Sequence, residues 1–468
     1  MGIFFQVIGT ILLCCSCTNM GIMMAWPSST IILFKSDNTT LHRPMGPTDV
    51  SLFGSLPAIG SLIANPIAGV LLNRLGRKKS VMLTALFFVL AWSIIALTRH
   101  VEVILTAMLV GGFGFAVFLE TTIYISEICQ DSIRGTMTSG PMLFYGFGIL
   151  VSYFLGGCLT YHQMVYACLS LSVTGILLLF VLKESPYTFM AQGREEDAVK
   201  SIAFYRSKKT TSEEVQHELN KLRKIFIPHS EDTESLTMKE EKYAQTTLEN
   251  KISCWEFFKN SPSTQREFLV IMILKVAYVF QGLPVVMVYA EPLFADAIPP
   301  DVISPNLCSV LMGVVMIISG SISAFLTDVV GRRPLLIYSS IIAGFCCIVL
   351  GMQIQTEWGP KWTVPMFIYL FTVFYTFGAG TVPVVVLAEV FLPEVKSIMS
   401  MLAVEWAWIL NFLILFVFNF LVTSVGLPPV FYFFSFTCVS TAVFFFYFLP
   451  ETKGLPVYAI QELFMKKK

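Results

Sequence analysis

Three charged residues stand inside long apolar runs of this sequence: Glu120, Lys275 and Glu405. A charge within the hydrocarbon layer of a membrane is costly, and such a residue usually faces a partner or a water-filled path. Lys275 could pair with Glu405 or with Glu120, which would offset the cost of burying it. Three interpretations of Lys275 stay open: a functional role, a structural ion pair, and extension of its amino group to the membrane surface.

A second set of charged residues recurs at the ends of apolar runs. Acidic and basic groups there can pair, and arginine suits this role because its planar guanidinium binds a carboxylate through two hydrogen bonds. Pairs between the first and second halves of the chain would act as a gate; the alternative is that the basic residues only orient the chain in a membrane. The candidate gate residues are Arg77, Lys78, Glu127, Arg134, Glu184, Asp328, Arg332, Arg333, Glu389, Lys396 and Glu451.

Long apolar segments must position these charges. A membrane-spanning helix needs about 20 apolar residues, and the sequence supplies about a dozen such segments. We therefore predict an all-α membrane protein with twelve transmembrane helices in two six-helix halves. The expected spans are 4–34, 50–72, 81–98, 102–125, 137–159, 163–182, 267–290, 303–327, 335–354, 362–388, 398–422 and 428–449.

The composition excludes several classes of protein. Of 468 residues, 55% are hydrophobic and only 13% are charged, whereas a soluble domain is about a quarter charged. Lys and Arg number 31, as do Asp and Glu, so no basic surplus exists for nucleic acid. The sequence contains no ATP-binding G-x-x-x-x-G-K-[ST] loop, no Cys/His metal spacing and no nucleophile–base set. We expect no enzymatic activity, no cofactor and no metal, and we expect all five histidines to lie in loops.

An internal repeat divides the chain into similar halves. Residues 73–78 and 328–333 both fit a template of one polar residue, two spacers, Gly and two basic residues. Parallel halves with substrate held between them are a known transporter architecture. The expected domains are a half at 1–182, a cytoplasmic linker at 183–266, a half at 267–449 and a cytoplasmic tail at 450–468.

The linker is the one extended soluble-like stretch. Apolar residues at helical spacing predict amphipathic helices that lie against the membrane domain: Ala198, Ile202, Tyr205, Val215, Leu219 and Leu222. Residues 229–250 are polar, and we expect them to be flexible.

Basic residues in short loops predict the orientation. Twelve lie in the loops after spans 2, 4, 8 and 10 and in the tail, against four in the opposite loops. Both termini and the linker should therefore be cytoplasmic. Asn38-Thr39-Thr40 is a glycosylation sequon on the expected outer side; the alternative is a chance match.

Several motifs together resemble the sugar porter family of the major facilitator superfamily. They cover both halves: 69–79, Glu127 with 134–135, 183–186, 328–333, 389–396, and the sequence Pro-Glu-Thr-Lys-Gly at 450–454. Residues 20–28, Pro141 and 192–198 look most like the insect facilitated trehalose transporter group. The resemblance implies a plasma-membrane carrier of trehalose or a hexose that works by alternating access, most simply as a uniporter.

The chain departs from the family pattern at several sites. Asn73 stands in place of a loop Asp, and Met23 stands where proton-coupled porters carry an Asp. Tyr278, Val279 and Pro284 stand where hexose porters carry amides that bind sugar hydroxyls. Since each unpaired buried hydroxyl costs roughly 1–3 kcal/mol, the usual hexose site is largely lost.

The remaining candidates for a substrate cavity are polar, aromatic or charged. For each tyrosine the alternative is core filling with one satisfied hydroxyl. The set is Glu120, Tyr145, Lys275, Tyr278, Gln281, Tyr375, Glu405, Trp408 and Asn411. Sugar transport is the preferred hypothesis for the function. The alternatives are transport of another small solute and a non-transporting sensor of the same fold. The sequence gives no oligomeric state.

Overall fold

The computed structural model describes residues 2–226, 258–259, 261–298, 303–455 and 457–466. The polar stretch expected to be flexible, 229–250, lies outside the described residues. Twelve helices are long and apolar enough to cross a membrane, and each coincides with one of the twelve expected spans. The all-α, twelve-helix prediction is therefore confirmed.

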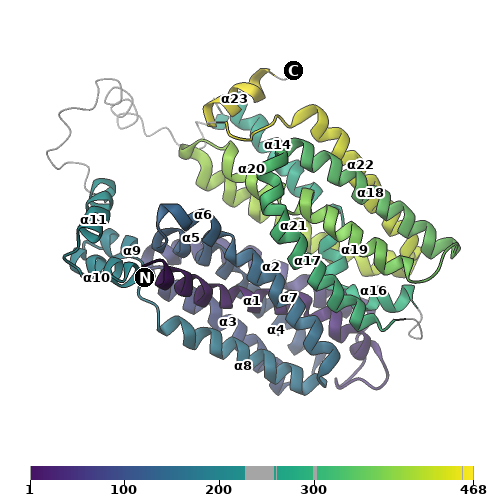
Figure 1. The fold of residues 1–468 in the computed structure, drawn as a ribbon. Helices are drawn as coiled ribbons and strands as arrows, with labels where there is room; N and C mark the ends of the chain where they lie inside the picture. The colour runs from purple at the N-terminus through teal and green to yellow at the C-terminus, as the bar shows by residue number, and fades with distance from the viewer. Residues whose placement is uncertain (1, 227–257, 260, 299–302, 456, 467–468) are drawn as a thin grey trace.

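The first half of the chain supplies six of these spans, and Figure 1 shows how their helices are arranged. Two of them are assembled from more than one helix: α4 continues through η1 into α5, and α6 leads into α7. The elements are α1 (Gly2–Lys35), α2 (Pro47–Leu75), α3 (Arg77–Leu97), α4 (Val101–Phe113), η1 (Gly114–Ala116), α5 (Val117–Ile128), α6 (Asp131–Thr138), α7 (Gly140–Cys158) and α8 (Tyr161–Phe180).

Three short helices follow α8: α9 (Pro186–Ala191), α10 (Glu195–Arg206) and α11 (Glu213–Phe226). On α10 and α11, Ala198, Ile202, Val215 and Leu219 are buried in a small core of their own. Tyr205 is buried in the main core, and α10 packs on α1.

The second half repeats the pattern of six spans. Its seventh and tenth spans are interrupted, at Gly282 and by the π-helical η2. The elements are α14 (Pro262–Phe280), α15 (Leu283–Val288), α16 (Ala290–Ala297), α17 (Pro305–Val330), α18 (Arg332–Thr356), α19 (Thr363–Tyr375), η2 (Thr376–Gly380), α20 (Val382–Val390), α21 (Pro393–Val425), α22 (Leu427–Phe448) and the terminal α23 (Val457–Lys466).

The two halves meet along equivalent helices. The main contacts between them are α2 with α21 and α7 with α17. In the repeat, α2 is equivalent to α17 and α7 is equivalent to α21. Exchanging the two halves therefore turns the α2–α21 contact into the α17–α7 contact. This arrangement is the two-fold relation expected from the repeat in the sequence.

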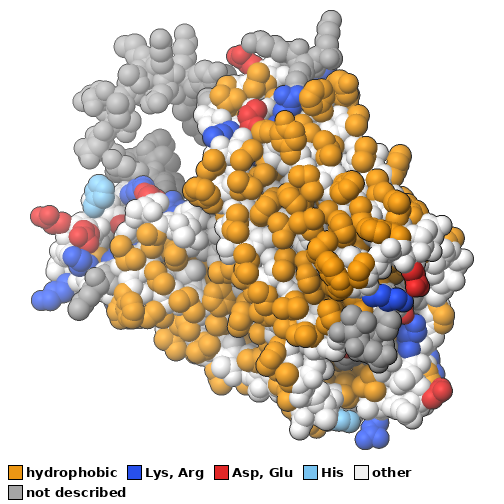
Figure 2. All heavy atoms as spheres, turned by 45° about the vertical axis from the view of Figure 1, so that its right-hand side comes forward, with side chains coloured by type: hydrophobic (Ala, Val, Ile, Leu, Met, Phe, Trp, Pro, Cys, Tyr) orange, Lys and Arg blue, Asp and Glu red, His pale blue; other side chains and the backbone are white. Residues whose placement is uncertain are grey.

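The surface suits a lipid environment. Apolar side chains cover the middle of the face in Figure 2, and charged ones gather toward the ends. Leu83, Phe325 and Phe436 are among the exposed apolar residues. We call the end where α1 begins and α22 ends the termini end. The other end, with loops 36–46 and 98–100, is the opposite end.

Candidate functional site

A buried arginine joins three segments at the termini end of the first half. Arg77, the first residue of α3, donates from Nε and Nη2 to the Glu127 carboxylate of α5 at 2.8–3.0 Å, and both side chains are about one-tenth exposed. Glu184 accepts the backbone N–H groups of Arg77 and Lys78 at 2.8 and 3.0 Å, and the Ser185 hydroxyl donates to Glu127. The first N–H groups of a helix lack helical partners, so a carboxylate is stabilised there.

The second half builds the same cluster. Arg332 begins α18 and donates to Glu389 of α20 at 2.6 Å. Glu451 accepts the backbone N–H groups of Arg332 and Arg333, each at 3.0 Å, and the Thr452 hydroxyl donates to Glu389 at 2.7 Å. The motifs around Glu184 and Glu451 therefore have one structural role: each caps a helix that begins with the buried arginine.

Glycine is required immediately before each arginine. Gly76 and Gly331 have φ of +92° and +99°, a region that side chains with a Cβ rarely adopt. A Cβ would also lie 2.7 Å from Glu184 Oε2 at Gly76 and 2.8 Å from Glu451 Oε2 at Gly331. The absence of a side chain lets each carboxylate reach the helix start.

The ion pairs of these clusters lie within the halves, not between them as the sequence suggested. Arg77 and Arg332 each bind a glutamate carried by a neighbouring helix of the same half. The reason is geometric, since the glycine turn directs each arginine inward toward its own bundle. Among the described residues, the clusters fasten helices inside a half and form no ion pair between the halves.

The other candidate gate residues lie at the edges of these clusters. Lys78 and Arg333 each cap the end of a helix, because their side chains donate to the carbonyls of Leu182 and Phe446. Lys396 donates to the Ala388 carbonyl at 2.6 Å. Two pairs are local: Arg134 with Asp131 at 2.7 Å, both exposed, and the exposed Asp328 with the buried Arg332 at 3.1 Å.

Glu120 has partners inside the first half and not across it. Its carboxylate accepts from Ser80 Oγ at 2.5 Å and from Thr84 Oγ1 at 2.6 Å, both on α3. The side chain is fully buried. Glu120 therefore holds α5 against α3, and the expected pair with Lys275 is not formed.

The Lys275 amino group lies over the Tyr278 ring, 5.8 Å from its centre, and the residue is buried. No carboxylate of the described residues comes within 4.0 Å of it, so the possible pair with Glu405 is not formed in this conformation either. Glu405 lies where α21 faces α2, with the Asn65 amide beside it but outside hydrogen-bond geometry. Both charges are thus left without ion-pair partners.

Most of the remaining cavity candidates are tied to their surroundings. Gln281 donates to Ser340 Oγ at 3.1 Å, and Asn411 donates to the Ala407 carbonyl of its own helix at 2.9 Å. The other interactions are Tyr375 Oη with the Tyr278 carbonyl and the Trp408 ring with the Phe115 ring across the halves at 5.7 Å. Tyr145 is partly buried against the core.

Hydrogen bonds close the bundle at its opposite end. The seventh span breaks at Gly282, with φ of +104°, and the short α15 and α16 then contact α1. Five bonds join the halves here: Tyr153 Oη to Met287 O (2.6 Å), Asn306 Nδ2 to Tyr153 O (3.1 Å), Glu291 N to Ser28 Oγ (2.9 Å), Asn419 Nδ2 to Pro47 O (2.9 Å) and Tyr289 Oη to Val50 O (3.5 Å).

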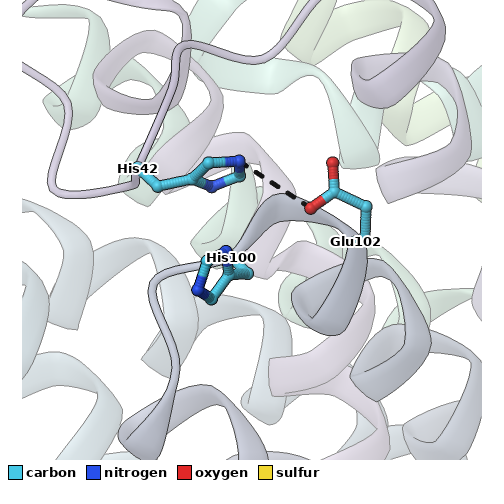
Figure 3. A group of neighbouring side chains, drawn as sticks. All are labelled: His42, His100 and Glu102. Atoms are coloured by element: carbon cyan, nitrogen blue, oxygen red, sulfur yellow. Dashed lines mark ion pairs between the residues drawn. The ribbon is translucent and has the colours of Figure 1, made fainter.

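The structure also assembles a group that the sequence did not reveal. His42, His100 and Glu102 lie together at the opposite end (Figure 3), with ligand atoms within 4.8 Å of one another. His42 comes from the loop between α1 and α2, whereas His100 and Glu102 stand at the start of α4, so no short spacing in the sequence connects His42 to the other two. The expectation that every histidine lies in a loop is wrong for His162 in α8 and His217 in α11; position 229 lies outside the described residues.

Comparisons with known proteins agree with this architecture. The profile of the family described as "Sugar (and other) transporter" matches residues 24–464. The facilitated trehalose transporter Tret1 of Culex quinquefasciatus is 26% identical, with 96% of this chain and 84% of that protein covered. The Aedes aegypti Tret1 is 25% identical, and the match spans 99% of this chain but 55% of that longer protein.

Solved structures share the fold. The partially occluded inward-open form of the Escherichia coli xylose transporter XylE superposes with a TM-score of 0.76 at 18% identity, covering 96% of this chain and 99% of that chain. XylE bound to 6-bromo-6-deoxy-D-glucose superposes with a TM-score of 0.70 at 19% identity, covering 99% and 100%. The chain belongs to the sugar (and other) transporter family.

Proposed function

We propose that the chain carries a sugar, trehalose or a hexose, across the plasma membrane by alternating access, as a facilitated uniporter. One observation carries the proposal: each half is fastened internally at the termini end, while hydrogen bonds join the halves at the opposite end. Two bodies built this way can rock about the substrate between them. Residues 1–182 and 267–449 are the moving halves, 183–266 the linker and 450–468 the tail.

The termini end is proposed to face the cytoplasm. Counted from the sequence, twelve basic residues stand in the tail and in the short loops after spans 2, 4, 8 and 10, against four in the opposite loops, and cytoplasmic loops carry the excess of Lys and Arg. The structure then corresponds to a carrier that is closed toward the outside. The charged clusters would contact each other only after the halves rock together at the termini end.

Glycosylation at Asn38 tests this orientation. Asn38 is exposed at the opposite end, and Asn38-Thr39-Thr40 is the one sequon in the chain. Expressed in insect or mammalian cells, the protein should shift to faster migration after treatment with peptide-N-glycosidase. Asn38→Gln and Thr40→Ala should migrate at the faster position without treatment, and Thr39→Ala should behave like the parent. A parent protein insensitive to the enzyme would contradict the assignment.

The similar proteins favour a sugar as the cargo, whereas the loss of the amides that usually bind sugar in this family argues against it. The curated relatives are named trehalose transporters, and one related structure holds a sugar analogue. In this chain Gln281 is engaged by Ser340, and Tyr278 stands in place of a family amide. The second candidate function is therefore carriage of another small solute. A non-transporting sensor is the outcome if no solute moves.

Uptake of labelled trehalose and glucose into cells that express the chain tests the cargo. Saturable uptake that is equal at two external pH values supports a sugar uniporter. Uptake that rises strongly in acid would instead indicate proton coupling. Absence of uptake, with the protein confirmed at the cell surface, would overturn the sugar proposal and call for a broader solute screen.

Lys275→Met should raise the KM for the transported sugar by at least about tenfold. A hydrogen bond to a charged donor is worth about 1.5–3 kcal/mol, and about 1.4 kcal/mol corresponds to a factor of ten. The amino group is buried without an ion-pair partner, so it is free to donate to substrate. Lys361→Met, at an exposed lysine of the opposite end, is the matched control. An equal KM in both variants would show that Lys275 does not contribute to substrate binding.

A further inference from the structure

Two loops of the first half are held together at the opposite end by one histidine. The His42 backbone N–H donates to the Arg99 carbonyl at 2.9 Å, and the His42 Nδ1 atom lies 3.2 Å from the same carbonyl. The loop between α1 and α2 is thereby docked against the residues that precede α4. His100 lies beside it, with the two imidazole centroids 4.7 Å apart.

Nδ1 of His42 has two backbone neighbours: it lies 3.2 Å from the Arg99 carbonyl, and the Val101 N–H donates toward it at 3.3 Å. The tautomer that donates to Arg99 is the one that leaves Nε2 available to a metal. When Nδ1 carries the proton and donates to the Arg99 carbonyl, Nε2 keeps its lone pair. Nε2 lies 3.9 Å from Glu102 Oε2, as Figure 3 shows. A histidine whose other nitrogen donates to a backbone carbonyl is the arrangement typical of metal-binding histidines, because the hydrogen bond fixes both the tautomer and the ring orientation.

Arg43 fixes Glu102 without using the oxygen that faces His42. Its Nη2 atom donates to Glu102 Oε1 at 2.8 Å, and its Nη1 atom donates to Asp49 Oδ2 at 2.5 Å. The hydrogen bond to Asp49, and to a smaller extent the one to Glu102, raises the pKa of the Arg43 guanidinium above its usual value. The guanidinium of Arg43, which stays charged, therefore orients Glu102 through Oε1. The other carboxylate oxygen, Oε2, can bind a second cation.

We propose that His42, His100 and Glu102 form a Zn²⁺ site on the outer face of the carrier. Their ligand atoms lie within 4.8 Å of one another and all three side chains are exposed, so a small movement of the His42 loop toward the start of α4 brings them onto one ion. Two imidazoles and a carboxylate, with water in the fourth position, are a common ligand set for zinc. Imidazole ligands favour Zn²⁺ and other transition-metal ions over Ca²⁺ and Mg²⁺, which prefer oxygen ligands.

The site is placed to act on transport. The docked loop runs from His42 to Pro47, and the Pro47 carbonyl accepts from Asn419 Nδ2 of the second half at 2.9 Å. A Zn²⁺ ion that clamps the loop holds the start of α2 in the position that closes the opposite end. External Zn²⁺ should therefore slow the return to the outward-facing state and reduce the maximal rate of transport. This second consequence rests on the proposed function; the binding of metal does not.

Binding of Zn²⁺ alone tests the site directly. The full chain, purified without a histidine tag and with Cys158→Ser to remove an exposed thiol, is titrated in lipid nanodiscs against a chromogenic zinc chelator. One equivalent should bind, and His42→Ala and His100→Ala should each weaken its affinity by more than about tenfold. Glu102→Gln should weaken it too, whereas His217→Ala, at the termini end, should leave it unchanged. Equal affinity in the parent and in the double variant His42→Ala/His100→Ala, or no binding by the parent, would overturn the site.

Uptake measurements distinguish the proposed effect of Zn²⁺ on transport from the binding of Zn²⁺ itself. Zn²⁺ added outside should lower the maximal rate in the parent but not in His100→Ala, whose rate without metal should equal that of the parent. Zinc binding without inhibition would refute the effect on transport while the site stands. If the chain carries no sugar at all, the titration still decides the metal site, so failure of the two proposals is distinguishable.

Discussion

Arg332→Ala should lower thermal stability sharply and abolish most transport. The change leaves the Glu389 carboxylate, 27% exposed, without the arginine that binds it at 2.6 Å. Breaking a buried ion pair by removing one partner costs about 3–5 kcal/mol, because an uncompensated charge stays behind. It also removes the side chain that links α18 to α20. The melting temperature of the purified protein and uptake per molecule at the surface are the measurements.

Two variants sharpen this prediction. Asp328→Asn should change stability little, because the Asp328 side chain is 74% exposed and such pairs contribute at most about 0.5 kcal/mol. The double variant Arg332→Ala/Glu389→Gln should recover part of the stability, since the stranded charge is gone. An Arg332→Ala protein as stable as the Asp328→Asn protein would show that the cluster does not fasten the half. Arg77→Ala, in the equivalent cluster, should repeat the result.

Gly54→Leu should reduce uptake by at least about tenfold with normal surface expression. A Cβ at Gly54 would lie 2.8 Å from Tyr289 Oη and 3.0 Å from Val288 Cγ1, both in the other half. A bulky residue there keeps α15 and α16 from seating against α2, so the opposite end cannot close. Overpacking costs about 1–3 kcal/mol, and about 1.4 kcal/mol is tenfold in an equilibrium.

Gly69→Leu is the matched control, because it lies on the same helix and a Cβ there meets nothing within 4 Å. It should transport like the parent. A second readout follows from Ser28, which is buried where the halves meet. In a Cys158→Ser background, Ser28→Cys should react with an impermeant maleimide faster when Gly54→Leu is present. Normal uptake by Gly54→Leu, or unchanged labelling, would show that closure at this end is not required.

The architecture could be predicted from the sequence because its signals are local and repeated. Each span is an unbroken apolar run, and the lipid requires that such a run be a helix. The glycine turns at positions 76 and 331 and the residues that follow them recur at matching places. These repeated motifs indicated charged residues at matching helix ends of the two halves, although not the pairing of those residues.

The pairing of individual side chains could not be predicted in the same way. Arg77 and Arg332 were expected to reach across the halves, but the turn before each directs it inward. Glu120 was one of two possible partners of Lys275, and its carboxylate is instead satisfied by Ser80 and Thr84 on a neighbouring helix. These outcomes depend on helix rotation, which apolar runs that are hydrophobic on every face do not encode.

The histidine group escaped sequence analysis for a different reason. Metal motifs are recognised by short spacing within one segment. Here α2 and α3 separate His42 from His100, and only the docking of one loop on another brings them together. Residues that meet through tertiary contacts of two loops leave no periodic pattern in the sequence.

Counterflow in proteoliposomes tests the central claim most directly. The purified chain is reconstituted, the vesicles are loaded with unlabelled trehalose, and entry of labelled trehalose is followed beside Gly54→Leu and Gly69→Leu. The account predicts saturable entry that is accelerated by internal sugar, abolished by Gly54→Leu and retained in Gly69→Leu. Entry that is neither saturable nor accelerated for trehalose or glucose would contradict a sugar carrier that works by alternating access.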